Sequence, residues 1–349
     1  MKPLPRIAVT MGDPAGIGPE LCLQLLANDG VAHECVPIVF GDARVLRRVA
    51  ERLGRRWDAP VLSLDGWAKS AGELRRSFVV DVPCVEAGEI VPGQVDARCG
   101  EAAFRCVVAS IDAALAGEVD AVTTAPLNKE ALHAAGHRYP GHTEIFAERM
   151  RAERSCMTFF SEELTCSLVT VHIGLHEVPG ALTSRRIADV IELTAEAVRR
   201  QRGREPRLAV LGLNPHAGEH GLFGCGEEER IIEPAIAVAR SQGLNVVGPW
   251  APDTGFLPVR RRETDAYICM YHDQALIPLK TLAFETAVNT TLGLPVVRTS
   301  VDHGTAFDIA WQGRASAANL FAAVRLAAQL SRSPAVGNAG SLHLNKPST

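Results

Sequence analysis

Three histidines stand at equivalent places in the chain, each just past a short apolar run. His172 closes "CSLVTVH", His216 follows "RLAVLGL" within "GLNPHAGEHG", and His272 closes "AYICMYH". Neutral imidazoles are good ligands for zinc and other divalent transition metals, and three of them with a fourth position open are typical of a catalytic metal site. The pattern therefore favours either a metal site or three separate hydrogen-bonded histidines near the core, with His176 and His220 as nearby competitors.

A second group of residues has the chemistry of an anion site. Lys280, Asn289 and Arg298 occur in "LKTLAFETAVNTTLGLPVVRTS", shortly after His272. Lysine offers a point charge and arginine a bidentate fork, the usual pair for a phosphate or carboxylate. Taken alone, Lys280 and Arg298 are typical of solvated surface charges, and the closeness of His272 in the sequence is what adds weight to the anion site.

The stretch "YPGHTEIF" has a similar character. Pro140 and Gly141 predict a turn, after which His142 and Thr143 begin a helix. Thr143 is a candidate N-cap residue, and a helix N-terminus is also a ready anion site. The two roles do not exclude each other.

Secondary-structure patterns explain how distant residues could meet. Short β-branched runs alternate with segments whose apolar residues recur every three or four positions, which is typical of strands alternating with helices. This order predicts parallel sheets covered on both faces, and loops that follow parallel strands converge on one crevice. The expected strands are 6–10, 36–40, 121–125, 166–171, 207–213, 266–271 and 294–300, and the expected helices are 101–116, 187–200, 227–242 and 317–330.

Composition excludes several classes of protein. The chain has 349 residues, 47% hydrophobic and 22% charged, which is enough for a large core in two domains. A net charge of −4 argues against a nucleic-acid partner. We expect no membrane span and no secretory signal, because no window is long and apolar enough. Nine scattered cysteines without a CxxC pair indicate reduced, mostly buried thiols in a cytoplasmic protein.

Five ordered motifs together resemble one family, 4-hydroxythreonine-4-phosphate dehydrogenase of vitamin B6 biosynthesis. They are "GDPAGIGPE", "YPGHTE", "LNPHAGE", "YHDQ" and "NTTLGLPVVRTSVDHGTAFDIA", and the similarity extends from about residue 6 to about residue 330. The resemblance implies an α/β fold like that of isocitrate and isopropylmalate dehydrogenases, with two α/β/α domains around a central cleft. We expect residues 1–128 plus 296–349 to form the cofactor-side domain and residues 129–295 the metal, substrate and dimerisation domain.

The resemblance also implies roles for individual residues. The metal ligands would be His172, His216 and His272, and the ion zinc, magnesium or cobalt. The substrate contacts would be His142, Thr143, Lys280, Asn289 and Arg298. By the same resemblance, NAD or NADP would bind "GDPAGIGPE" and "DHGTAFDIA", which explains why no Rossmann fingerprint is found: GxGxxG fails at Leu21. The expected cofactor-binding residues are Gly12, Asp13, Gly18, Asp302, His303, Gly304, Thr305 and Asp308. The family is a homodimer whose active site is shared between subunits, so that His272 would serve a neighbour's metal.

The activity that the resemblance implies is NAD(P)-dependent oxidation of 4-phosphonooxy-L-threonine at C3, followed by decarboxylation to 3-amino-2-oxopropyl phosphate. Asp253, Asp273 and His142 are the candidates for the general base, and Asp273 is equally a candidate for fixing an imidazole tautomer. A sibling dehydrogenase of D-threonate or D-erythronate 4-phosphate shares these motifs. A metal-dependent phosphohydrolase and a non-catalytic phosphometabolite binder are further alternatives for the function of the chain. Neither uses a nicotinamide cofactor, so neither would explain the motif "DHGTAFDIA".

Overall fold

The twelve strands of the described residues form one continuous sheet. The computed structural model describes residues 3–70, 76–84, 90–284 and 286–332. The strand order is β3-β4-β2-β1-β5-β12-β11-β6-β7-β10-β8-β9. The strands are β1 Arg6–Thr10, β2 Val36–Gly41, β3 Val61–Ser63, β4 Phe78–Asp81, β5 Ala121–Thr124, β6 Cys156–Phe160, β7 Cys166–Leu168, β8 Leu208–Leu211, β9 Val246–Trp250, β10 Ala266–Cys269, β11 Val288–Leu292 and β12 Val297–Ser300.

Helices cover both faces of this sheet, as the alternation of strands and helices predicts. They are α1 Gly18–Leu26, α2 Asp29–Ala32, α3 Ala43–Arg52, α4 Leu64–Ser70, α5 Ala97–Leu115, α6 Lys129–Ala134, α7 His142–Arg149, α8 Val178–Ala181, α9 Ser184–Arg202, α10 Glu233–Ser241, α11 Pro252–Gly255, α12 Pro258–Glu263, α13 His272–Ala283 and α14 Ala318–Arg332. Short 3-10 segments occupy Leu175–Glu177, Pro215–Gly218 and Phe307–Ile309, and a π-helical turn, Glu228–Ile232, leads into α10.

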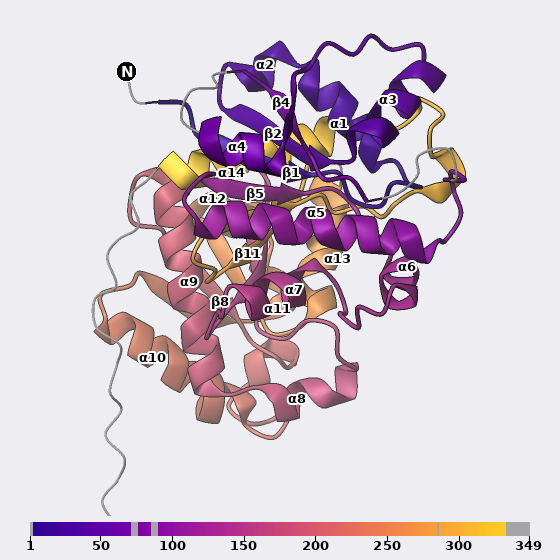
Figure 1. Cartoon of the computed structure of the whole chain (residues 1–349). Coiled ribbons are helices and arrows are strands. Elements are labelled where there is room, and N and C mark those ends of the chain that lie inside the picture. The colour runs from indigo at the N-terminus through magenta and orange to yellow at the C-terminus, as the bar shows by residue number, and fades with distance from the viewer. Residues whose placement is uncertain (1–2, 71–75, 85–89, 285, 333–349) are drawn as a thin grey trace, which may run out of the picture.

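The core lies in two layers, one on each face of the sheet. Successive residues of β1 point to opposite faces, so that Ile7 and Val9 pack with α1, α3 and α14 whereas Ala8 packs on the side of α5. Helices α9, α10 and α14 cover the first face over the other half of the sheet, and α13 covers the second face there. In Figure 1 the segment from β1 to α5 lies in the upper part of the molecule, and residues from about 150 to 260 lie in the lower part.

The all-parallel sheet expected from the sequence is wrong at its centre. Strand β11 runs antiparallel to both of its neighbours, β12 and β6, and β6 runs antiparallel to β7. Parallel neighbours need a crossover of a dozen residues or more. The short connections between β6 and β7 and between β11 and β12 permit only hairpins, and neither turn carries an Asn-Gly or Asp-Gly signal. The proposed division into two domains stays a prediction.

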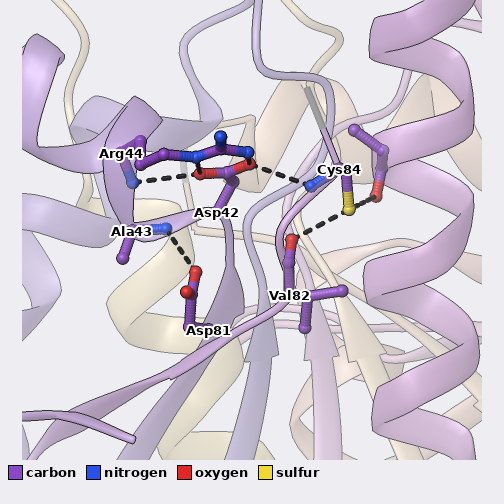
Figure 2. A network of polar contacts seen from close by, with 7 residues as sticks. Asp42, Ala43, Arg44, Asp81, Val82 and Cys84 are labelled. Atoms are coloured by element: carbon purple, nitrogen blue, oxygen red, sulfur yellow. Dashed lines mark hydrogen bonds and ion pairs between the residues drawn. The ribbon is translucent and has the colours of Figure 1, made fainter. Parts of the chain in front are cut away.

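Polar contacts fix the start of α3 beside the sheet. The buried Asp42 is the N-cap residue, and its carboxylate accepts hydrogen bonds from the N–H of Arg44 at 3.0 Å and the N–H of Cys84 at 2.9 Å (Figure 2). Asp81 at the end of β4 accepts the N–H of Ala43 at 2.9 Å. These bonds satisfy N–H groups that a helix start leaves free, and they tie α3 to the segment after β4.

Two expectations from composition hold in the described residues. No described helix is both long enough and apolar enough to span a membrane. None of the nine cysteines is paired, and most of them are buried, with Cys225 as the one exposed thiol.

Candidate functional site

The three candidate metal ligands lie after neighbouring strands. Strands β7, β10 and β8 are adjacent and parallel, and they are followed by His172, His272 and His216 respectively. Because the carboxyl ends of parallel strands lie at one edge of a sheet, the fold brings all three loops to the same edge. The position of each histidine after one of a set of parallel strands is as the sequence predicted, and their role as metal ligands stays a prediction.

Two of the three imidazoles face each other within one chain. The ring centroids of His172 and His272 are 5.7 Å apart. Asp273 Oδ1 lies 2.7 Å from His272 Nδ1, so that Nδ1–H donates to the carboxylate and leaves the Nε2 lone pair free. Burial of the ring, and then the charges of Lys129 and His272, lower the pKa of His172. A neutral imidazole and an oriented one are the donors that a divalent transition metal prefers.

His216 occupies a turn with unusual backbone geometry. His216 and Ala217 lie in the left-handed region at φ 54° and 53°, and Glu219 and His220 follow at φ 42° and 55°. Each such residue costs roughly 1–3 kcal/mol unless its surroundings enforce it. The ring of His216 is 5.9 Å from that of Phe223. In the part of the chain that is described, no three His, Cys, Asp or Glu side chains lie close enough together to hold a metal.

A buried arginine forms the centre of the candidate anion site. Arg298 on β12 is 2% exposed, and its two Nη atoms donate to the hydroxyls of Thr291 at 3.0 Å and Thr124 at 2.7 Å. Its Nε has no hydrogen-bond partner among the described residues. Burial lowers the pKa of Arg298 to about 9, although the charge of Glu144 opposes this shift. A charge held in this way is costly to the fold and available to an anion.

Two further predicted substrate residues leave buried polar atoms free. His142 Nε2 and Asn289 Oδ1 are both buried, and neither has a hydrogen-bond partner within the described ranges. Burial, followed by the charges of Arg298 and Lys129, lowers the pKa of His142 well below its usual value, so that the ring is neutral. A ligand that hydrogen-bonds these atoms would remove the penalty of burying them.

The start of α7 differs from the expected cap. Helix α7 begins at His142 with Gly141 as the N-cap residue, so that Thr143 lies inside the first turn and does not cap it. The interpretation of Thr143 as an N-cap is therefore wrong, because the extended Gly141 already takes that position. Because Gly141 has no side chain, the N-cap residue offers no side-chain acceptor to the N–H groups of this turn.

Lys280, a predicted substrate residue, contacts the second predicted cofactor motif, "DHGTAFDIA". Its Nζ lies 3.8 Å from Asp302 Oδ2 and 5.7 Å from the ring centroid of Phe284. Burial raises the pKa of Asp302, while the charges of Lys280, His303 and His272 oppose the shift. Asp302, the first residue of the "DHGTAFDIA" loop, thus lies within range of the charges of Lys280 and His272.

The two predicted cofactor motifs pack directly on each other. The N–H of Ile17 donates to the carbonyl of Thr305 at 3.0 Å, and Glu20 accepts hydrogen bonds from the N–H groups of Trp311 and Gly313, each at 2.9 Å. A Cβ on Gly16 would lie 2.9 Å from the Thr305 carbonyl oxygen. The loops after β1 and β12 therefore form one unit, with a backbone contact that only glycine permits.

Residues of this unit differ in what they can contact. Gly12, Asp13 and Gly18 are buried, and a Cβ on Gly12, whose φ is +74°, would lie 2.2 Å from the Pro126 carbonyl oxygen. Asp13 Oδ1 accepts the Ala15 N–H at 2.8 Å, Oδ2 has no partner in the described chain, and burial raises the pKa of Asp13 to about 7. In contrast, the remaining predicted cofactor residues are exposed or half-buried: Asp302, His303, Gly304, Thr305 and Asp308.

The base candidates occupy different surroundings. Asp253 is exposed on α11, which packs against the turn that carries His216. Asp273 is hydrogen-bonded to His272, and His142 is neutral beside two cations. Asp273 thus has the geometry of the tautomer-fixing role that was considered for it.

The structure adds three residues that the sequence analysis missed. The charge of Lys129, at the start of α6, acts on both His142 and His172, and the charge of Glu144 acts on both His172 and Arg298. Glu228 accepts hydrogen bonds from the turn before His216. Lys129 follows β5 in the same way as the histidines follow their strands, and that position was a usable signal.

A cavity of about 460 Å³ lies away from these residues. Its walls come from α9, from residues 151–154 and from the hairpin turn between β11 and β12. The carboxyl end of β12, which leads to Asp302, is at the opposite end of that hairpin. The three histidines do not line the cavity, although Thr291, which accepts a hydrogen bond from Arg298, does.

Comparison with known proteins identifies the class first. A 1.25 Å crystal structure of 4-hydroxythreonine-4-phosphate dehydrogenase from Klebsiella pneumoniae has the same fold, with a TM-score of 0.84 and 42% identity over 95% of this chain and 100% of that one. The predicted α/β dehydrogenase fold is confirmed, and the chain is an oxidoreductase.

The chain belongs to the family described as "Pyridoxal phosphate biosynthetic protein PdxA", whose sequence model matches residues 33–327. A relative from Desulfosudis oleivorans named 4-hydroxythreonine-4-phosphate dehydrogenase is 45% identical over 94% of this chain and 96% of its own length. A relative from Salmonella typhimurium named D-threonate 4-phosphate dehydrogenase is 43% identical over 93% of this chain and 98% of its own length.

Proposed function

We propose that this dehydrogenase oxidises 4-phosphonooxy-L-threonine at C3 with NAD or NADP and a divalent cation. The β-keto acid then loses carbon dioxide to give 3-amino-2-oxopropyl phosphate for vitamin B6 biosynthesis in the cytoplasm. The observation that carries this proposal is the set of buried, partnerless polar atoms on His142, Asn289 and Arg298. A phosphorylated substrate would satisfy them.

The proposed residues divide the work between positioning and charge. His142, Thr143, Asn289 and Arg298, with Lys280, bind the phosphate, and that binding energy orients C3. When bound, the cation (zinc, magnesium or cobalt) would stabilise negative charge on substrate oxygens and the nicotinamide would accept the hydride. Asp273 fixes the His272 tautomer, so that Nε2 carries the free lone pair.

Proton removal from the C3 hydroxyl is assigned to Asp253. His142 is flanked by the charges of Arg298 and Lys129, which oppose its protonation, and Asp273 is occupied by His272. Asp253 is exposed beside the turn that carries His216 and has a free carboxylate in the described chain. The loops after β1 and β12 hold the cofactor. Gly12, Asp13 and Gly18 shape the first loop, and the exposed residues of the second loop contact the cofactor directly.

A homodimer with a shared site completes the proposal. Leu175, Leu222, Ile277 and Phe284 are 69%, 70%, 67% and 68% exposed, and each lies on a loop or helix that carries one of the three histidines. Large apolar side chains exposed around a functional site are typical of an interface. A second copy placed there would bring its own His272 to the metal of its neighbour.

A sibling activity on D-threonate 4-phosphate is the second candidate. Relatives with that name are 43% and 42% identical to this chain, close to the 45% of the first-named activity. The two substrates share a phosphate and a hydroxy acid and differ in the group at C2. The anion and metal residues described above serve either of them.

The deciding experiment follows the absorbance of reduced nicotinamide with each phosphorylated substrate, before and after chelation and metal repletion. We expect turnover of 4-phosphonooxy-L-threonine that chelation removes and metal restores. His216→Ala should lose both metal and turnover, whereas His220→Ala, in the same loop, should keep both. Turnover of D-threonate 4-phosphate alone would move the assignment to the sibling, and metal-independent turnover would exclude the histidine site.

A further inference from the structure

The loop that carries His216 cannot hold its shape by local preference alone. Four non-glycine residues, His216, Ala217, Glu219 and His220, have φ between 42° and 55°. L-residues avoid this region because Cβ approaches the following carbonyl oxygen, and consecutive residues there are rare. Such a conformation persists only where neighbouring groups enforce it.

Glu228 supplies the enforcing contacts. Its side chain is 1% exposed, and Oε1 accepts the N–H groups of Leu213 at 2.9 Å and Asn214 at 2.8 Å. Its Oε2 accepts the side-chain amide of Asn214 at 3.0 Å. One buried carboxylate thus receives three hydrogen bonds from the two residues that begin the loop.

The loop is shaped around this carboxylate from its other side as well. A Cβ on Gly218 would lie 2.7 Å from Glu228 Oε2, and a Cβ on Gly212 would lie 3.2 Å from Oε1. Glu227 adds a second anchor, because its Oε2 accepts the Asn214 side-chain amide at 3.0 Å and the Cys225 N–H at 2.8 Å. Asn214 is therefore held between two carboxylates, two residues before His216.

We propose that Glu228 is a positioning residue for metal binding, which fixes the backbone at 213–214 and thereby places the imidazole of His216. The inference rests on the proposed function, in which His216 is a metal ligand. Charge-assisted hydrogen bonds from backbone N–H groups are short and strong, so the carboxylate sets the geometry of the loop. Groups that orient a ligand in this way change metal affinity about 10–100-fold when they are removed.

The test measures Co²⁺ binding to the metal-free, full-length protein by visible absorption, together with its thermal midpoint. Glu228→Ala removes all three hydrogen bonds. Glu228→Gln keeps Oε1 and loses only the acceptor for the Asn214 side-chain amide. Asn214→Ala breaks the same contact from the other side. With these two variants the test continues even if Glu228→Ala fails to fold. Asp265→Asn is the matched control, because Asp265 is also buried and accepts a backbone N–H, that of Arg207 at 2.8 Å, but lies before β10 at the opposite end of that strand.

We expect Glu228→Ala to weaken Co²⁺ binding by about 10–100-fold, with smaller losses for Glu228→Gln and Asn214→Ala. Asp265→Asn should lower the thermal midpoint but keep the wild-type affinity and spectrum. Folded Glu228 and Asn214 variants with wild-type affinity would overturn the inference while His216→Ala, measured in parallel, still loses the metal. Wild-type affinity in His216→Ala would overturn the proposed metal site and this inference together.

Discussion

Asp13 provides a test of the glycine-rich loop that needs neither substrate nor cofactor. Its side chain is 0% exposed, and burial raises its pKa from the usual 3.8 to about 7. An unfolded chain ionises this carboxyl at about pH 4, whereas the folded protein keeps it protonated to about pH 7. In this window the folded state binds more protons than the unfolded state, so the free energy of unfolding falls as the pH rises. A pKa difference of about 3 corresponds to about 4 kcal/mol, fully lost at about pH 8.

Asp13→Asn should remove this loss, because an amide does not ionise. The assay is urea unfolding of the metal-free wild type and variant from about pH 5 to about pH 8, where we expect the variant to gain roughly 2–3 kcal/mol relative to wild type. Asp265→Asn is the control. Burial raises the pKa of Asp265, but hydrogen bonds from Arg204 and the Arg207 N–H outweigh burial and lower the pKa overall. The difference in free energy of unfolding between wild type and Asp265→Asn therefore stays flat above about pH 5. A flat difference for Asp13→Asn as well would refute the buried, protonated carboxyl.

Three further outcomes follow from the site. Gly18→Ala should destabilise the protein by about 3 kcal/mol in urea unfolding, since its Cβ would lie 2.0 Å from the Met11 carbonyl oxygen; a change below about 1 kcal/mol would contradict that contact. Arg298→Met should leave the ligand-free protein equally or more stable while raising KM for the phosphorylated substrate at least about tenfold, because it removes a buried charge whose desolvation the charge of Glu144 does not offset; an unchanged KM would remove Arg298 from the anion site. The folded protein keeps His142 neutral at pH values where the unfolded chain protonates it, so stability should fall as the pH drops below about 6.5. Thermal midpoints across that range should fall less in His142→Asn than in wild type, and parallel pH profiles would contradict this assignment.

Local patterns predicted seven of the twelve described strands, and they missed β3 and β4 at one edge of the sheet, β9 at the other, and β6 and β11 near its centre. The run "RIAVT" coincides with β1, and the apolar residues of 187–200 lie within α9. Strand β11, "VNTTL", carries three polar residues whose burial depends on the strands beside it, so its sequence did not indicate a strand. Its antiparallel direction is a property of the assembled sheet, which no single segment encodes.

The candidate site shows the same division. Residue type and position after a strand indicated His172, His216 and His272, the charge chemistry of the side chains indicated the anion residues, and the family resemblance assigned their roles. Neither could indicate Glu228, because a glutamate in a helical segment is usually a solvated charge, and its burial beneath the His216 loop depends on tertiary packing. Likewise Lys129 and Glu144 gained a functional context only when the fold placed their charges beside His142 and Arg298.

The continuous sheet has a practical consequence for dissecting the enzyme. Strands β12 and β11 pair through residues 289–291 and 298–300, and this ladder joins the half that contains the loops after β1 and β12 to the half that contains the histidines. Because the first half combines β1–β5 with β12, separating the halves takes two cuts in the chain, one between β5 and β6 and one between β11 and β12. The separation would expose two inner strands with unpaired N–H and C=O groups, which favour aggregation. Gene fragments that separate the halves should therefore be insoluble when expressed alone and should regain solubility only when co-expressed, so that each supplies the missing edge of the other.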